Sequence, residues 1–445
     1  MKQRNSKAYS FIWLLLLSII LLTSKPGFTQ TQSGTSNLIY PADFVYKGAI
    51  RLPTDTTSDG FGWAYGGGGM GYNPNGDPGG AGDGYPGSLY GVGSTPSIPY
   101  GAVSEISIPA PVVTTDISKM PVAKTLQPFT DITQGMRASI SAATDNLWAY
   151  TWGLTYMPKM GTQATDKLYW TVHAYYNTAS VDNPSLGWSE LTFANPQAKG
   201  LWHIGPWGGD YNAVRTSKYL FDVPTDWANA NMNGRLLMSG RYRGVGAGGH
   251  GPTLYSVAHQ TTASPPANGA VIDAKMLVWY PLCADPYARP NTCAFPNYTP
   301  CDDWTGAAYL TAGTNSAIVI VGRKGLGNAY YGTPPPGNAE TDHGFFCDGY
   351  EQQFLLYNPA DLVAVANGQK QPQDVLPYAT VKPQQYLLPD GRALMGGAAF
   401  DRARGLFYVF QYGVDTNTSP ILHVFSVGTQ GTNPPPASPK GLSVR

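Results

Sequence analysis

The chain has 445 residues, no formal net charge at pH 7, and charged side chains at only 13% of its positions. A neutral chain has no global field that would draw it to nucleic acid or to an anionic membrane, so any charge selectivity must be local. Its 53 glycines, 38 prolines and 29 tyrosines indicate a turn-rich β protein rather than a helical or disordered one.

Residues 1–29 are typical of a signal peptide. Lys2, Arg4 and Lys7 precede an apolar run at 11–22 that is too short to span a bilayer. We therefore expect a secreted or periplasmic protein without membrane association after cleavage. An uncleaved N-terminal anchor is the alternative. The remainder is expected to form one domain over 38–428, followed by a Pro-rich tail at 429–445.

The same unit recurs along the chain: a strand of small residues, a turn, a strand that opens on an apolar residue, a loop and a third strand. In chain order these predicted strands are 66–73, 89–93 and 103–109; 152–157, 168–172 and 188–193; 219–223, 236–240 and 253–258; 307–311, 318–322 and 353–358; and 396–400, 406–410 and 421–427. Glycine and alanine dominate many of the first strands, whereas aromatic and β-branched residues dominate the later ones. This gradient predicts that first strands converge where space is short, as in the blades of a β-propeller.

Fourth strands are predicted after most units, at 124–132, 199–204, 275–282 and 375–382. The last unit has none, but residues 44–52 form a strand-like run near the N-terminus. An N-terminal strand in the last blade would close the ring and remove the exposed sheet edge. The sequence thus predicts an all-β fold of five four-stranded blades. Six or seven blades are the alternative.

Several stretches carry a resemblance to known proteins: 65–74, 103–109, 126–135, 251–257 and 396–411. There the chain resembles an uncharacterised family of exported bacterial proteins with propeller-like repeats and no established activity. The resemblance implies export and a repeated architecture, and it assigns no site. Members of that family tend to carry His where this chain has Ser94, which argues against a catalytic role for that serine.

Four cysteines lie in the second half of the chain: Cys283, Cys293, Cys301 and Cys347. In an exported protein an even number of cysteines indicates disulfides. We favour Cys283–Cys293 and Cys301–Cys347, with the other two pairings open. Metal binding by these cysteines is a weaker alternative because no CxxC spacing or nearby His pair supports it. No cofactor is predicted, although a structural or catalytic divalent cation remains open.

The best functional clue is a set of polar residues that recurs five positions after the first residue of each second strand: Ser94, His173, Arg241, Arg323 and Gln411. Equivalent places in a repeat predict a ring of side chains at one end of the propeller. Arg241 and Arg323 would neutralise a carboxylate, and His173 would act as base or acid with Tyr175 or Tyr242 as its partner. The structural alternative is that the arginines pair with loop carboxylates such as Asp342 or Asp348.

Loops at the same end supply further candidates for substrate binding, together with Gln411: Trp207, Tyr242, Arg243, His250, Tyr330, Tyr331 and His343. These ring and loop residues together predict binding of an extracellular, uronate-containing polysaccharide, with elimination as the favoured reaction. A non-catalytic glycan- or protein-binding propeller is the alternative. A carboxylate-dependent glycoside hydrolase ranks lower because the first strands nearly lack acids. Glu105, Glu190 and Glu351, in or beside third strands, are expected to face solvent.

Overall fold

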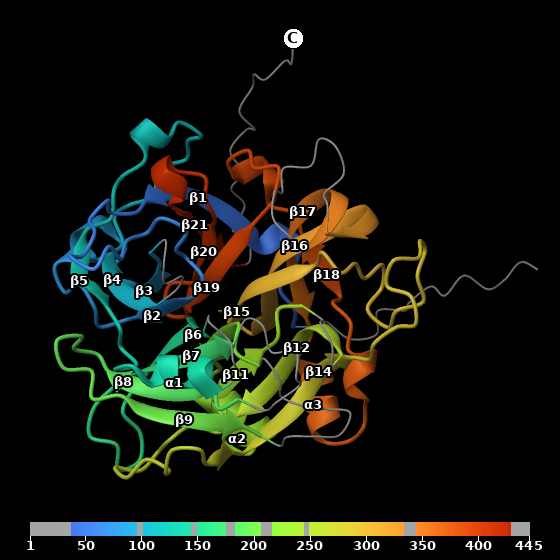
Figure 1. Ribbon diagram of the computed structural model, residues 1–445, viewed down its shortest axis with the longest axis horizontal. Coiled ribbons are helices and arrows are strands. Elements are labelled where there is room, and N and C mark those ends of the chain that lie inside the picture. Colours follow the sequence, from blue (N-terminus) through green and yellow to red (C-terminus); the bar gives the residue numbers. More distant parts are fainter. Residues whose placement is uncertain are drawn as a thin grey trace, which may run out of the picture. The chain divides into compact units, whose positions relative to one another are not determined.

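The computed structural model describes residues 37–95, 101–143, 149–174, 183–205, 216–243, 249–332 and 344–428. Five antiparallel sheets stand in a ring in these residues and form a five-bladed β-propeller (Figure 1). The predicted fold class and blade number are confirmed. The predicted signal peptide and the Pro-rich tail lie outside the described residues.

In each blade the strands follow chain order from the inner strand outward, and the last blade ends on β1. The strands are β1 (Phe44–Arg51), β2 (Met70–Asn73), β3 (Ser88–Gly93), β4 (Ala102–Ser107), β5 (Thr125–Thr130), β6 (Ala149–Met157), β7 (Lys167–Ala174), β8 (Leu186–Glu190), β9 (Lys199–Ile204), β10 (Tyr219–Asp222), β11 (Leu237–Gly240), β12 (His250–Val257), β13 (Val271–Ile272), β14 (Ala274–Tyr280), β15 (Asp303–Ala312), β16 (Asn315–Tyr331), β17 (Phe345–Tyr357), β18 (Ala379–Val381), β19 (Met395–Asp401), β20 (Leu406–Gln411) and β21 (Ile421–Val427). The inner strands are β2, β6, β10, β15 and β19. The short β13 adds a fifth, parallel strand to blade two by pairing with β9.

Closure of the ring by the N-terminal strand is confirmed. Strand β1 pairs with β21 from Phe44 opposite Val427 to Arg51 opposite Ile421, and Figure 1 shows the blue strand beside the red one. A bulge interrupts this ladder between Tyr46 and Gly48, and the φ of +130° at Gly48 favours glycine. A Cβ atom there would lie 2.4 Å from the carbonyl carbon of Val112. The first and last parts of the described chain are thus held in one sheet.

The inner strands are as crowded as their small residues predict. A Cβ atom on Gly69 would lie 1.5 Å from the carbonyl oxygen of Trp152 in the next blade. A Cβ atom on Gly397 would lie 2.5 Å from the carbonyl carbon of Gly69. Neighbouring blades therefore touch backbone to backbone around the axis, and larger side chains fit only farther out.

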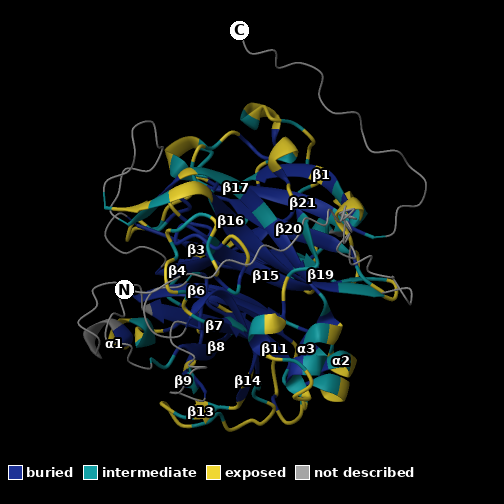
Figure 2. Ribbon diagram, turned by 90° about the vertical axis from the view of Figure 1, so that its right-hand side faces the viewer, coloured by how far each residue is buried: buried dark blue, intermediate teal, exposed yellow. Residues whose placement is uncertain are grey.

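Helices occupy the connections: α1 (Met136–Ala143), α2 (Thr225–Asn231) and α3 (Pro359–Ala366), with 3₁₀ turns η1 (Pro41–Asp43), η2 (Gly80–Asp83), η3 (Ile117–Lys119), η4 (Pro372–Asp374), η5 (Gln384–Tyr386) and η6 (Thr416–Thr418). Helix α3 begins after Asn358, whose side chain accepts a hydrogen bond from the Ala360 amide, and it buries Leu362. Figure 2 shows buried strands in the interior, with exposed surface on α2 and α3. Among the described residues, no helix is long and apolar enough to cross a membrane.

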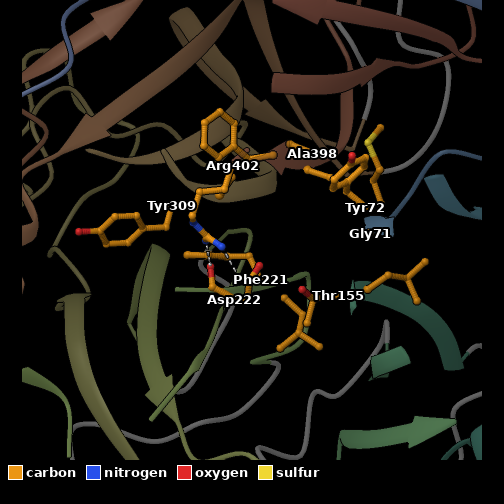
Figure 3. A pocket seen from close by; sticks show the side chains of 14 residues that line it. Gly71, Tyr72, Thr155, Phe221, Asp222, Tyr309, Ala398 and Arg402 are labelled. Atoms are coloured by element: carbon orange, nitrogen blue, oxygen red, sulfur yellow. Dashed lines mark hydrogen bonds and ion pairs between the residues drawn. The ribbon is translucent and has the colours of Figure 1, made fainter. Parts of the chain in front are cut away.

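The axis of the propeller is closed where the inner strands end. A cavity of about 30 Å³ there is lined by all five blades, which leaves room for one or two water molecules. Arg402, just after β19, spans it and forms an ion pair with Asp222 at the end of β10, at 2.8 Å (Figure 3). We call the side of the propeller on which the inner strands begin the loop face. The side on which they end, where this cavity lies, is the opposite face.

Strands β16 and β17 continue past the blade, well beyond the predicted 318–322 and 353–358. Their ladder runs from Ile318 opposite Tyr357 to Tyr331 opposite Phe345, with one irregularity between Leu326 and Ala329. The extension forms a long hairpin on the loop face.

Candidate functional site

The predicted ring residues end the second strands at the loop face, as the repeat requires. His173 is the penultimate residue of β7, Arg241 directly follows β11, and Gln411 is the last residue of β20. Arg323 lies within the longer β16, and Ser94 directly follows β3. The five positions are equivalent in the fold, but their side chains have different surroundings.

His173 is enclosed in the wall of the propeller. Its side chain is fully buried, with Nδ1 3.1 Å from the Ser217 hydroxyl oxygen. The imidazole packs edge to face against Tyr242, with ring centroids 5.3 Å apart, and against Trp152 at 6.3 Å. The rings of Trp152 and Tyr242 therefore separate His173 from the loop-face end of the propeller axis.

Lys218 lies against the same two aromatic rings, those of Trp152 and Tyr242. It directly precedes the inner strand β10, is 4% exposed, and lines the narrow cavity between the inner strands. Its ammonium nitrogen lies 2.9 Å from the centroid of a Trp152 ring and 4.3 Å from that of Tyr242. Such contacts between a cation and aromatic faces partly replace the water that the ammonium has lost.

Burial lowers the pKa of Lys218 well below its ordinary value. The carboxylate of Asp303, the first residue of β15, opposes this shift, and the Arg243 guanidinium adds to it. Sequence reasoning missed Lys218 because it lies outside the repeated offset. Its position directly before an inner strand was the one available signal.

The arginines near Lys218 come from the loop after β11. The half-buried Arg243 stacks on Tyr242, with its guanidinium carbon 5.0 Å from the ring centroid. Arg241 is 1% exposed and donates to the Gly249 carbonyl oxygen at 3.0 Å. We call Lys218, Arg241 and Arg243 the basic cluster. All three belong to blade three and lie next to His173 of blade two.

Arg323 lies in blade four and has a separate environment. It donates to the carbonyl oxygen of Arg392 at 2.8 Å, and its guanidinium carbon lies 4.3 Å from the centroid of the Tyr350 ring. Asp348, expected as an arginine partner, instead accepts hydrogen bonds from Tyr330 and Asn328.

Gln411 acts as a clamp inside blade five. Its amide nitrogen donates to the Leu388 carbonyl oxygen at 2.7 Å, and its amide oxygen accepts from the Leu388 amide at 3.0 Å. The same oxygen lies 3.0 Å from Nε2 of His423. Ser94 is also buried, and its hydroxyl donates to the Thr95 carbonyl oxygen at 3.3 Å. The three contacts of Gln411 hold β20 to β21 and to the connection before β19, whereas the Ser94 hydroxyl contacts only the next residue in the chain.

Both favoured disulfides, Cys283–Cys293 and Cys301–Cys347, are present. His250 lies beside the first of them: its Nε2 accepts from the Cys283 amide at 3.1 Å, and its ring stacks on Tyr298 at 3.9 Å. Burial, and secondarily the Arg241 charge, lower the pKa of His250 to about 4. Although His250 and the two sulfurs lie within 4.8 Å of one another, the sulfurs are joined, so this group does not support a metal site.

The hairpin of β16 and β17 carries exposed aromatic residues on the loop face. Tyr331 is 66% exposed and packs against Phe345 with ring centroids 5.0 Å apart, and Phe345 lies 6.3 Å from Tyr287. Tyr330 is 36% exposed, and its hydroxyl donates to Asp348 at 3.0 Å. The Cys301–Cys347 disulfide fixes this hairpin to the preceding connection. We call Tyr287, Tyr331 and Phe345 the aromatic strip.

The remaining predicted residues divide into two groups. Tyr175, Trp207 and His343 lie outside the described residues. The expectation that the third-strand glutamates face solvent is wrong for Glu105, which is 6% exposed. Glu190 and Glu351 are half-buried and form ion pairs with Lys167 and Lys382.

No protein-family model matches the chain, and a search of curated proteins finds no match either. The function must therefore be inferred from the chemistry of the loop face.

Proposed function

We propose that the protein binds an anionic, uronate-containing polysaccharide on its loop face, with the basic cluster as the carboxylate site. The observation that carries this proposal is Lys218, whose ammonium is withdrawn from water into the box of Trp152 and Tyr242. Within the described residues no hydrogen bond or ion pair holds that ammonium. A ligand carboxylate would supply the missing negative charge, and the forked donors of Arg243 fit the same group.

The aromatic strip supports a polymeric rather than a monomeric ligand. Aromatic faces suit the apolar faces of sugar rings, and Tyr331 presents most of its surface to solvent. Tyr331 of the aromatic strip lies eight positions after Arg323 in β16, which corresponds to roughly 26 Å of extended strand. A ligand that reaches from the ring position of Arg323 to the aromatic strip is therefore an oligosaccharide or a longer chain.

Elimination is the second candidate function. It needs Lys218 as the neutral amine instead of the ammonium of the binding proposal, and the lowered pKa of Lys218 favours that neutral form. A neutral amine can remove the C5 proton of a uronate while Arg243 neutralises its carboxylate. The C4–O bond then breaks as the C4–C5 double bond forms, and the departing oxygen takes a proton from an acid such as Tyr242. In this scheme Lys218 replaces His173 as the base, because aromatic rings enclose the histidine.

Binding can be tested by calorimetry with oligogalacturonates and with neutral galacto-oligosaccharides. Lys218→Met keeps the stacked alkyl chain but removes the charge, and it should weaken oligogalacturonate binding at least tenfold. Lys119→Met is the control, because Lys119 is an exposed lysine of η3 and lies outside the basic cluster. Equal affinity of wild type and Lys218→Met for oligogalacturonates, or equal binding of charged and neutral oligomers, would refute the carboxylate site.

Turnover is followed separately by the ultraviolet absorbance of unsaturated uronates. Products formed by the wild type but not by Lys218→Met would support elimination. Binding without any such absorbance across polygalacturonate, alginate and glucuronans would leave a non-catalytic binding propeller as the function.

We also propose that the protein works outside the cytoplasm. Two disulfides in the described chain support this, because such bonds form and persist in oxidising compartments. Fractionation of the producing cells tests it: recovery of the mature chain with the cytoplasm would contradict export.

A further inference from the structure

A second candidate site lies on the opposite face, in a groove between blades one and two. The groove has a volume of about 390 Å³, which lies within the usual range of small-molecule sites. Its walls come from the connection after β2, from β3, β4 and β5, and from the turn after β8. Six of its residues carry the inference that follows: Asn73, Asp77, Tyr90, Glu105, Leu126 and Gln127.

Glu105 forms part of the groove wall although it is only 6% exposed. One carboxylate oxygen accepts a hydrogen bond from the Ser88 hydroxyl, and the other accepts from Nε2 of Gln127 at 2.5 Å. The hydroxyl of Tyr90 lies nearby, and burial and the Glu105 charge both raise the pKa of Tyr90. Glu105 is thus held in place by neutral donors.

The glutamates of the next blades provide an internal comparison. Glu190 in β8 pairs with Lys167 at 2.6 Å, and Glu351 in β17 pairs with Lys382 at 3.0 Å. Within the described residues, no lysine or arginine forms an ion pair with Glu105, although Glu105 is the most buried of the three. Neutral hydrogen bonds offset only part of the cost of burying a carboxylate, so a bound cation would stabilise Glu105 further.

The backbone opposite Glu105 is shaped closely around it. A Cβ atom on Gly76 would lie 2.9 Å from Oε1 of Glu105 and 1.8 Å from the Ser88 hydroxyl oxygen. Asp77 brings a second carboxylate to the rim, and the 38% exposed Leu126 gives the groove an apolar side. The amide of Asn73 donates to the Tyr90 hydroxyl at 3.0 Å and fixes the inner end.

We propose that this groove binds a small organic cation through its primary ammonium group, with Glu105 as the counter-ion. The ammonium has three donors, which suits the two Glu105 oxygens and the Asp77 carboxylate. The rest of the ligand lies along Leu126 and the neighbouring apolar surface. An amino sugar and an alkylamine share this chemistry. The charge preference is opposite to that proposed for the loop face, and the two sites lie at opposite ends of the propeller.

The test is calorimetry on the full chain with glucosamine, n-butylamine and glucose as probes. Binding of both amines but not of glucose is expected. If glucosamine alone binds, the source is an amino sugar; if n-butylamine alone binds, it is an alkylamine. Glucose binding as tightly as glucosamine, or failure of both amines to bind at millimolar concentration, would overturn the proposal.

Variants locate the binding. Glu105→Gln keeps the volume and can still hydrogen-bond Ser88 and Gln127, so it should fold and lose at least tenfold in amine affinity. Asp77→Asn on the rim should weaken amine binding a few-fold and remains informative if Glu105→Gln does not fold. Glu351→Gln, the same change at a third-strand glutamate outside the groove, is the matched control and should bind amines as the wild type does. Unchanged affinity in Glu105→Gln, or in Asp77→Asn if the former does not fold, would refute the site.

Discussion

Replacement of His423 by asparagine should make the protein less sensitive to acid. His423 lies in β21 and is fully buried, with Nε2 3.0 Å from the amide oxygen of Gln411 and Nδ1 2.9 Å from the hydroxyl of Tyr46. The Gln411 oxygen also accepts from the Leu388 amide, which fixes it as an acceptor. Nε2 of His423 therefore carries the proton, and Nδ1 accepts from Tyr46.

Burial lowers the pKa of His423 from its ordinary 6.5 to about 3. Between these two values the unfolded chain binds the proton and the folded chain does not, so the free energy of unfolding falls as the pH falls. At about 1.4 kcal/mol per pKa unit, the move from pH 7 to pH 4 removes about 3 kcal/mol through this one residue. Below pH 3 both states are protonated and the loss is complete.

The assay is urea unfolding followed by tryptophan fluorescence at pH 7 and pH 4. His423→Asn can still accept from Tyr46, and it should lose about 3 kcal/mol less than the wild type over this pH range. Val424→Ala is the control: it removes buried methyl groups from the same strand, costs about 2 kcal/mol at both pH values, and leaves the pH dependence unchanged. His250 is present in all three proteins, so its titration cancels. An equal loss in His423→Asn and wild type would refute the reasoning.

Two further predictions concern the disulfides and the closure of the ring. Serine substitution of the Cys301–Cys347 pair, separated by 46 residues, should cost about 4 kcal/mol of unfolding free energy. The same change at Cys283–Cys293, separated by 10 residues, should cost about 3 kcal/mol, and the reverse order in urea unfolding would contradict the loop-length argument. Gly48→Ala should cost about 3 kcal/mol or more through overpacking and backbone strain, whereas Gly60→Ala, at φ +80° with open space around it, should cost less. Equal melting temperatures for the two alanine variants would show that the β1 bulge is not crowded.

The blades could be predicted because the small residues of the inner strands indicate where neighbouring backbones lie close together. Glycine and alanine are required where Gly69 and Gly397 meet the backbone of neighbouring blades, and this requirement is visible within a few residues of sequence. The closing strand could be predicted because the last unit lacked its outer strand. The cysteine pairing followed in the same way from which loops emerge together on the loop face.

The positions of Lys218 and Glu105 could not be predicted because burial in a blade depends on its neighbours. Alternation of polar and apolar residues marks a strand with one solvated face, but all six residues of β4 are buried, Glu105 among them. The box around Lys218 joins Trp152 of blade two to Tyr242 of blade three, residues far apart in the chain. The length of the β16–β17 hairpin could not be predicted for another reason. Its extension has the composition of a loop, although it forms an antiparallel ladder.

Neutral net charge does not argue against charge-selective binding by this chain. Exposed charges are screened by salt and contribute little over distance, whereas Lys218 and Glu105 are both almost fully buried and act at short range. Because they lie on opposite faces, a change at one should leave binding at the other intact, since sites without shared partners behave additively. Amine binding that survives in Lys218→Met, together with oligogalacturonate binding that survives in Glu105→Gln, would show two independent sites of opposite preference. Loss of both functions in either variant would instead point to damage of the fold.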